Sequence, residues 1–201
     1  MVAACGDNSC GQLGTGDYHS KKLLTLIKLP QDMTSIVSVS AGKSHTIILG
    51  HNQDQQPIVA TCGDNDCGQL GTGDKKTKNQ LISIQVPETM TTIESAYAGS
   101  DCTFIIGHNK DKQPMVVACG ANVYGQLGIG VMGNKKQLTT IQLPTGMARI
   151  QSLMTCLLIT SLPTPRGLST GSSVLAEISW IPWTSHGTSE ISAVLSFQWC
   201  V

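Results

Sequence analysis

The chain has 201 residues, 40% of them hydrophobic, and its thirteen basic residues balance thirteen acidic ones. A chain without net charge has no overall field to attract nucleic acid or a membrane surface, so a charged partner must be met by a local patch. The longest apolar segment, near residues 154–162, is too short to cross a bilayer as a helix, and residues 1–15 lack the pattern of a secretion signal. We therefore expect a cytoplasmic protein with reduced thiols, no transmembrane segment and no strong nucleic-acid signal.

A glycine-rich motif occurs three times at a spacing of 57 residues. It reads "CGDNSCGQLGTGD" from Cys5, "CGDNDCGQLGTGD" from Cys62 and "CGANVYGQLGIGV" from Cys119. The text between the motifs follows the same period, as three aligned prolines show: Pro30, Pro87 and Pro144. Self-similarity at a fixed spacing of tens of residues is typical of a solenoid, a propeller or an array.

Each period contains four predicted strands. Thr34–Gly42 alternates apolar and small polar residues, and His45–Gly50 is rich in β-branched residues, so both segments predict strands. After a polar hairpin, Ile58–Gly63 predicts a third strand and the alternating segment Asn79–Pro87 a fourth. The fourth strand has two counterparts in the other periods, Lys22–Pro30 and Lys136–Pro144. Four strands per period predict a propeller blade, and the fold class is all-β.

The glycine motif itself is interpreted as architectural. Where the chain reverses after the third strand, glycine permits positive φ and a close backbone approach, and asparagine can bond its own backbone. The predicted structural turn residues are Gly6, Asn8, Gly11 and Gly14, then Gly63, Asn65, Gly68 and Gly71, then Gly120, Asn122, Gly125 and Gly128. One leucine per motif is expected to anchor the loop between blades: Leu13, Leu70 and Leu127. A phosphate cradle is disfavoured because no glycine run leads into a helix.

The cysteine pairs of the motif are compatible with two interpretations. Cys5 with Cys10, and Cys62 with Cys67, have a spacing that could be part of a zinc site. The third copy has Tyr124 at the second position, and no histidine occurs at a matching offset. Structural packing is therefore favoured, and we expect no metal and no cofactor.

A row of lysines is predicted along the stacked blades. The periodic members are Lys21, Lys78 and Lys135, and their neighbours are Lys22, Lys75, Lys76 and Lys136. One interpretation is a set of solvated loops balanced by Asp17 and Asp74. The other is a contact surface for an acidic protein, a lipid or a nucleic-acid phosphate.

The motif "GDNDCGQLGTGD" and the segment "VSAGKSHTIIL" at Val39–Leu49 resemble the repeat of the regulator of chromosome condensation family. The resemblance covers residues 1 to about 150 and implies a seven-bladed propeller. Seven periods of 57 residues would need about twice this chain, so we expect a partial, open propeller of about three four-stranded blades. Because Met1–Cys5 aligns with Met115–Cys119, the first blade is expected to lack two strands. The open blade edges must be capped, paired or tolerated, which includes pairing by self-association.

The sequence departs from the family in the motif cysteines, where an aromatic residue is usual, and at Cys102, which replaces the histidine found at His45. We interpret His45 as a buried, hydrogen-bonded residue that links strands, not as a catalyst. The 57-residue pattern stops near residue 150. Residues 151–201 contain no Lys, Asp, Asn or Tyr and hold all three tryptophans. This irregular C-terminal segment is either a separate appendage or the product of a changed reading frame, and we favour the second.

The residues show no recurring Ser/His/Asp or Cys/His arrangement, so we predict no covalent catalysis. The resemblance implies a protein-interaction platform, and the founding type of the family is a guanine-nucleotide exchange factor for the small GTPase Ran. Short bacterial effectors with such repeats target the same GTPase, and an effector would act in the host cytosol. The alternatives are a non-catalytic scaffold or adaptor, and a truncated fragment without independent activity.

Overall fold

The computed structural model describes residues 2–145, which form ten β-strands and no helix. The strands are β1 (Val2–Gly6), β2 (Lys21–Ile27), β3 (Ser35–Ala41), β4 (His45–His51), β5 (Pro57–Gly63), β6 (Lys78–Ile84), β7 (Thr92–Ala98), β8 (Cys102–His108), β9 (Pro114–Gly120) and β10 (Lys135–Ile141). Among these residues no helix is long and apolar enough to cross a membrane. The boundary predicted near residue 150 and the segment 151–201 lie outside the described residues.

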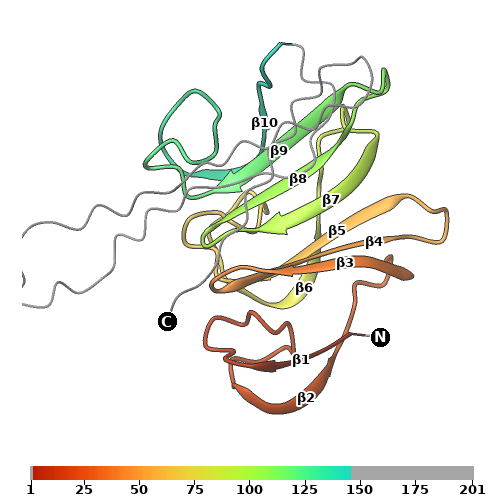
Figure 1. Ribbon diagram of the computed structural model, residues 1–201. Coiled ribbons are helices and arrows are strands. Elements are labelled where there is room, and N and C mark those ends of the chain that lie inside the picture. The colour runs from red at the N-terminus through yellow and green to blue at the C-terminus, as the bar shows by residue number, and fades with distance from the viewer. Residues whose placement is uncertain (1, 146–201) are drawn as a thin grey trace, which may run out of the picture.

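The strands form three separate antiparallel sheets (Figure 1). The first sheet pairs β1 with β2, the second has the order β3-β4-β5-β6, and the third has the order β7-β8-β9-β10. Each four-stranded sheet is a meander whose strands are neighbours in sequence, as in a propeller blade. The predicted all-β fold of open blades is confirmed, and so is the two-stranded first blade.

The strand register repeats with the 57-residue period. In the second blade His45 lies opposite Gly63, and in the third blade Cys102 lies opposite Gly120. The register between the third and fourth strands shifts in all three blades near the start of the fourth strand. The repeated sequence therefore builds the same backbone path each time.

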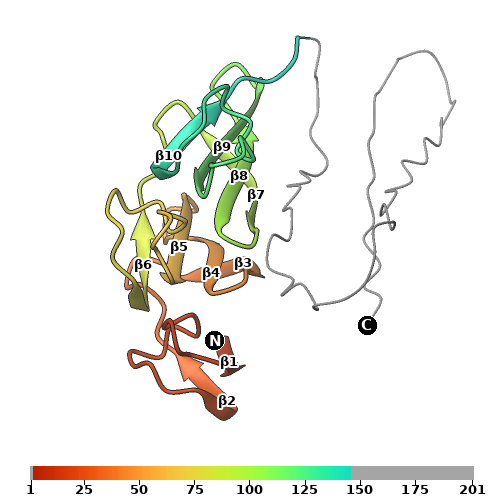
Figure 2. The same ribbon diagram turned by 90° about the vertical axis from the view of Figure 1, so that its left-hand side faces the viewer.

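The hydrophobic core lies between the blades, which stack face to face along an arc (Figure 2). One cluster, which includes Ile47, Leu49, Ile105 and Val117, joins the second blade to the third. A second cluster around Ile48 and the other inward side chains of β4–β6 packs against Val2, Ile27 and Leu29 of the first blade. Stacking buries both apolar faces of a central blade, which no single blade could bury alone.

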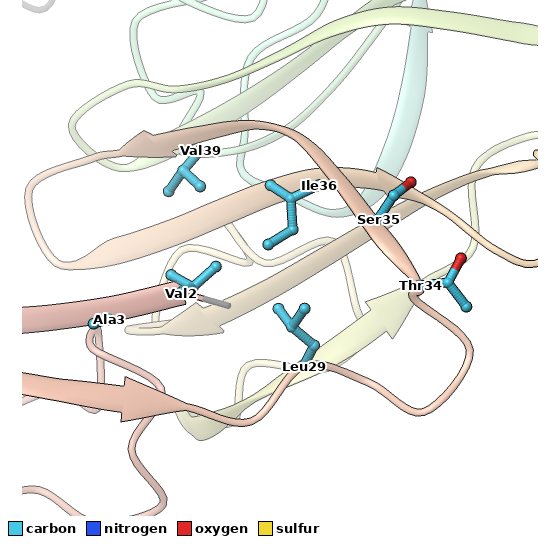
Figure 3. A pocket seen from close by; sticks show the side chains of 7 residues that line it. All are labelled: Val2, Ala3, Leu29, Thr34, Ser35, Ile36 and Val39. Atoms are coloured by element: carbon cyan, nitrogen blue, oxygen red, sulfur yellow. The ribbon is translucent and has the colours of Figure 1, made fainter.

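An open cavity of about 560 Å³ lies between the first and second blades. Figure 3 shows Val2 and Leu29 facing Ile36 across it, with Val39 on the same strand, β3. Val39 is 51% exposed, whereas its counterpart Ala96 is 5% exposed against the second blade. The cavity occupies the place where the other blades have their first two strands.

Candidate interaction site in the glycine-motif loops

Three loops connect the third and fourth strands of the blades: loop 1 (residues 7–20), loop 2 (64–77) and loop 3 (121–134). Every turn glycine named above has positive φ, between 67° and 113°. These loops hold the predicted turn residues, and most of the predicted lysines lie in or beside them. They are the candidate site because they combine a fixed backbone with exposed side chains.

A buried asparagine holds each loop in shape. Asn65 is fully buried, and its Oδ1 accepts a hydrogen bond from the backbone N–H of Leu70 at 3.0 Å. Its Nδ2 donates to the carbonyl and the carboxylate of Asp74, at 3.1 and 3.0 Å. Asn8 and Asn122 accept the same bond from the leucine amides of loops 1 and 3, at 2.9 Å each. One side chain thus supplies the partners that a helix or sheet would otherwise provide.

The loops also dock on the fourth strand of the next blade. A Cβ at Gly68 would lie 2.5 Å from the Cα of Lys136, and the N–H of Gly73 donates to the carbonyl of Lys136 at 2.7 Å. Loop 1 makes the same approach to β6, since a Cβ at Gly11 would lie 2.6 Å from the Cα of Asn79. Glycine is required here because two backbones are in contact.

A backbone carbonyl of each docked loop binds the second and third strands of the next blade. The carbonyl of Gln69 accepts hydrogen bonds from Thr103 Oγ1 at 2.7 Å and from the Cys119 thiol at 3.5 Å. The carbonyl of Gln12 accepts a bond from Thr46 Oγ1, also at 2.7 Å. The motif therefore reverses the chain and also links neighbouring blades. The sequence analysis had expected only the leucine of each motif to make such a link.

The comparisons with known proteins agree with this geometry. The family model for the regulator of chromosome condensation (RCC1) repeat matches residues 2–49. The chain carries RCC1 repeats. It is 27% identical over 155 residues to the X-linked retinitis pigmentosa GTPase regulator homolog of Caenorhabditis elegans, covering 77% of this chain and 10% of that protein.

Two further proteins share the RCC1 repeats or their fold. The secretion-regulating guanine nucleotide exchange factor of Mus musculus is 32% identical over 136 residues, which cover 64% of this chain and 26% of that protein. The solved structure of Prp20p from Saccharomyces cerevisiae, described with its binding properties to Gsp1p and histones, has a TM-score of 0.55 at 20% identity. That match covers 72% of this chain and 35% of Prp20p. The chain thus spans a tenth to about a third of the length of these proteins.

His45 joins two RCC1 blades. It is buried, and its Nε2 lies 3.1 Å from Thr103 Oγ1. Because the Thr103 hydroxyl already donates to the carbonyl of Gln69, its oxygen accepts from a proton on Nε2. Burial lowers the pKa of His45 to about 4, and the carboxylates of Asp101 and Asp64 oppose this shift only in part. The His45 side chain is therefore a neutral hydrogen-bond donor that links two blades. The sequence analysis had expected it to link strands.

The free energy of unfolding should fall as the pH falls from about 6.5 to about 4. In this window the unfolded chain protonates His45 while the folded chain keeps it neutral, which is the sign expected for a depressed pKa. A shift from 6.5 to about 4 corresponds to a loss of about 3 kcal/mol. Denaturant titrations at pH 7 and pH 4.2 measure it, and His45→Gln should remove most of the difference. Hydrogen bonds to Lys21, Thr72 and Lys78 lower the pKa values of the Asp17 and Asp74 carboxyls. Protonation of these carboxyls therefore changes the stability mainly below this pH window.

Two of the motif cysteines, Cys62 and Cys119, are buried between the stacked RCC1 blades. Burial raises the pKa of the Cys62 thiol to about 12, and it raises the pKa of Cys119 as well. A thiol held in this form is a poor nucleophile and a poor metal ligand. No disulfide joins the cysteines of residues 2–145, and this part of the chain holds no group of three or more His, Cys, Asp or Glu side chains placed to bind a metal ion.

The predicted lysines fall into two groups. Lys21 and Lys78 pair with Asp17 and Asp74 of their own loops, at 2.6 and 2.9 Å. Lys135 has no such partner, because Val131 stands at the aspartate position. The other four have no carboxylate within salt-bridge distance among residues 2–145: Lys22, Lys75, Lys76 and Lys136. Since β2, β6 and β10 lie along one side of the arc (Figure 2), these charges form a broken row. Their role as a partner contact stays a prediction.

The structure also shows exposed apolar side chains that the sequence interpretation missed. On loop 3 they are Val123, Tyr124, Val131 and Met132, and on β2 they are Leu23, Leu24 and Leu26. Three of these positions hold polar residues in the other repeats: Gln80 and Gln137 align with Leu23, Ser83 and Thr140 with Leu26, and Asp17 and Asp74 with Val131. An alignment of the three repeats shows these replacements, so the sequence contained a signal for the exposed apolar side chains.

Proposed function

We propose that this chain is a protein-binding propeller segment that binds a Ran-type small GTPase and accelerates nucleotide release from it. The observation that carries the proposal is the set of RCC1 repeats with their rigid, exposed loops. The mouse relative is named a guanine nucleotide exchange factor, and the yeast Prp20p structure is described with binding to Gsp1p and histones. These names support the assignment of a protein partner, and of a GTPase in particular.

Nucleotide exchange suits a protein in which the buried Cys62 and Cys119 thiols are poor nucleophiles and the buried histidine is neutral. An exchange factor forms and breaks no covalent bond, since it accelerates release by binding the nucleotide-free GTPase more tightly than the loaded one. Such differential binding needs a surface that keeps its shape while the partner changes. The buried asparagines and the interblade bonds give loops 1 and 2 that rigidity, because each loop is held both internally and by the next blade.

A non-catalytic scaffold is the second candidate, and the exposed apolar side chains of loop 3 favour it. Val131 and Met132 are 56% and 75% exposed. Apolar groups gathered on a rigid loop are typical of protein contacts, and they require no effect on a bound nucleotide. A scaffold of this kind would bind its partner equally well in every nucleotide state.

Release of a fluorescent guanine nucleotide from purified Ran tests the proposal. We expect the full chain to accelerate release in proportion to its concentration and to bind nucleotide-free Ran more tightly than loaded Ran. No acceleration at a large excess of the chain would contradict the exchange activity. Equal binding to the loaded and the nucleotide-free GTPase would favour the scaffold instead.

Removing lysine charges that have no carboxylate partner tests whether these lysines contact a binding partner. Lys22, Lys75, Lys76 and Lys136 are changed together to alanine, and we expect the association rate with an acidic partner to fall by about fivefold or more at low salt. The matched control changes Lys110 and Lys112, which lie in the β8–β9 hairpin away from the loops. An unchanged association rate in the variant with four substitutions would show that these lysines are solvated and contact no partner.

A further inference from the structure

We propose that two copies of this chain associate head to tail, with loop 3 of one copy docked on the β1–β2 sheet of the next. The two junctions inside the chain serve as the template, because loop 1 docks on β6 and loop 2 docks on β10 through the same contacts. The proposed junction would be a third one of the same kind. This inference concerns self-association and stands independently of the GTPase proposal.

Loop 3 keeps the docking backbone but has nothing docked on it among the described residues. Gly125 and Gly130 have positive φ, and a Cβ added at either glycine would have no neighbouring atom within 4 Å. Their counterparts in loop 2 are Gly68, which touches the backbone of β10, and Gly73, which lies over Gln137. Gly128 and Gly130 are exposed, so the docking side of loop 3 faces open space.

The β1–β2 sheet presents the matching receptor. Leu24 is 74% exposed, although its counterparts Leu81 and Leu138 pack against the preceding blade. Cys5 is exposed, whereas Cys62 and Cys119 are buried against the docked loop. The thiol and the leucine that receive a loop in the other blades are therefore present here and uncovered.

The side chains at these two surfaces have changed together. At the internal junctions the glutamine side chains of β6 and β10 lie over loop glycines, with 3.0 Å from Gln80 to a Cβ built at Gly16. The aligned residue on β2 is Leu23, which is 80% exposed. On the loop side, Val131 follows Gly130 where loops 1 and 2 carry aspartate. The template would bring Leu23 over Gly130 and beside Val131, so polar groups meet at the internal junctions and apolar groups meet at this one.

A second copy is the occupant because both halves of the contact lie on the same chain. Leu24 would pack against the outer face of the third blade, where Ile129, Ile141 and Leu143 cover the buried cluster around Phe104 and Leu127. The same pairing of faces is seen between the first and second blades, through Ile27, Leu29 and Leu81. Such a contact is heterologous, so it builds a ring or a chain of copies and not a symmetric pair.

Sedimentation velocity and light scattering of the full chain provide the test, with concentrations from about 1 µM to about 500 µM to span moderate and weak affinities. We expect the mass to rise above the 21.2 kDa of one chain as the concentration increases. Alkylation of Cys5, followed by mass spectrometry, should slow as the mass rises, while alkylation of the loop thiol Cys10 serves as the reference. A chain that stays monomeric over the whole range would overturn the proposal.

Two variants block the two surfaces separately. Leu24→Asp places a charge in the contact and is exposed in the single chain. Gly125→Asn places a Cβ where the template has backbone contact, and asparagine tolerates positive φ. Each variant alone should remain at 21.2 kDa, and an equimolar mixture should form a dimer and nothing larger. The mixture also shows that both variants are folded.

The mixture is decisive because only a head-to-tail contact allows this complementation. Each variant retains one intact surface, so a single productive junction forms between the two. If the wild type associates but the mixture stays monomeric, the contact lies elsewhere and the proposal is overturned. Association of either variant alone to the extent of the wild type would overturn it as well.

Discussion

Gly68→Ala in loop 2 should lower the free energy of unfolding by about 4 kcal/mol. Two costs add at this residue. The positive φ of 86° costs an alanine about 1–2 kcal/mol. The new Cβ would also lie 2.5 Å from the Cα of Lys136, so loop 2 must move away from β10 and weaken the bonds from Gly73 and Thr103.

Gly125→Ala is the matched control for this prediction. Gly125 has nearly the same φ, 77°, and nothing lies within 4 Å of its built Cβ. Only the conformational cost of about 1–2 kcal/mol applies to it. Denaturant unfolding at low protein concentration compares the two variants. Equal losses would show that the contact between the blades contributes nothing measurable.

Asn65→Ala should destabilise the protein by about 3–4 kcal/mol, because several buried polar groups lose their partner together. The amide of Leu70 loses its acceptor, and the hydroxyl of Thr72 and the carbonyl and carboxylate of Asp74 lose their donor. Leu70 is fully buried, so water cannot easily replace the lost bond.

Asn52 provides the comparison for the asparagine prediction. It also accepts a backbone hydrogen bond within a turn, from Gln56 at 2.8 Å, but that turn is exposed. Water replaces the partner there, and Asn52→Ala should cost only about 0.5–1 kcal/mol. Thermal and denaturant unfolding measure both variants. A loss at Asn65 no larger than at Asn52 would contradict the role of Asn65 as the centre of loop 2.

Among residues 2–145 the arc of stacked blades leaves one blade face uncovered at each end, and these two end faces differ from the internal junctions. The internal junctions combine tight glycine contacts with polar side chains such as Gln80 and Asp74. The ends carry Leu23 and Val131 at the aligned positions. The apolar side chains of these end faces are removed from water only when another protein surface packs on them. The end faces are therefore the strongest candidates for a protein contact.

The positions of the first three strands of a blade could be predicted from the sequence because they depend on local patterns, whereas the fourth strand ends at Ile84, before the predicted Pro87. Alternation in Thr34–Gly42 and the β-branched run in His45–Gly50 placed β3 and β4 to within a residue at each end. The turn glycines could be predicted for the same reason, since a motif repeated at a fixed spacing implies a repeated backbone path. The docking of Gln69 on Thr103 could not, because it joins residues 34 apart in different repeats and uses a main-chain carbonyl.

The sequence alone determined the repeat, the four-stranded unit and the reversal of the chain at the glycines, because each depends on residues close together in the chain. Only the tertiary structure decided which surfaces of those units are covered. Burial of His45 and exposure of Leu24 and Met132 depend on which blade lies beside which. The repeated blades share one backbone path. Within residues 2–145, however, the middle blade has a neighbour on both faces and each end blade has a neighbour on one, so equivalent residues meet different environments.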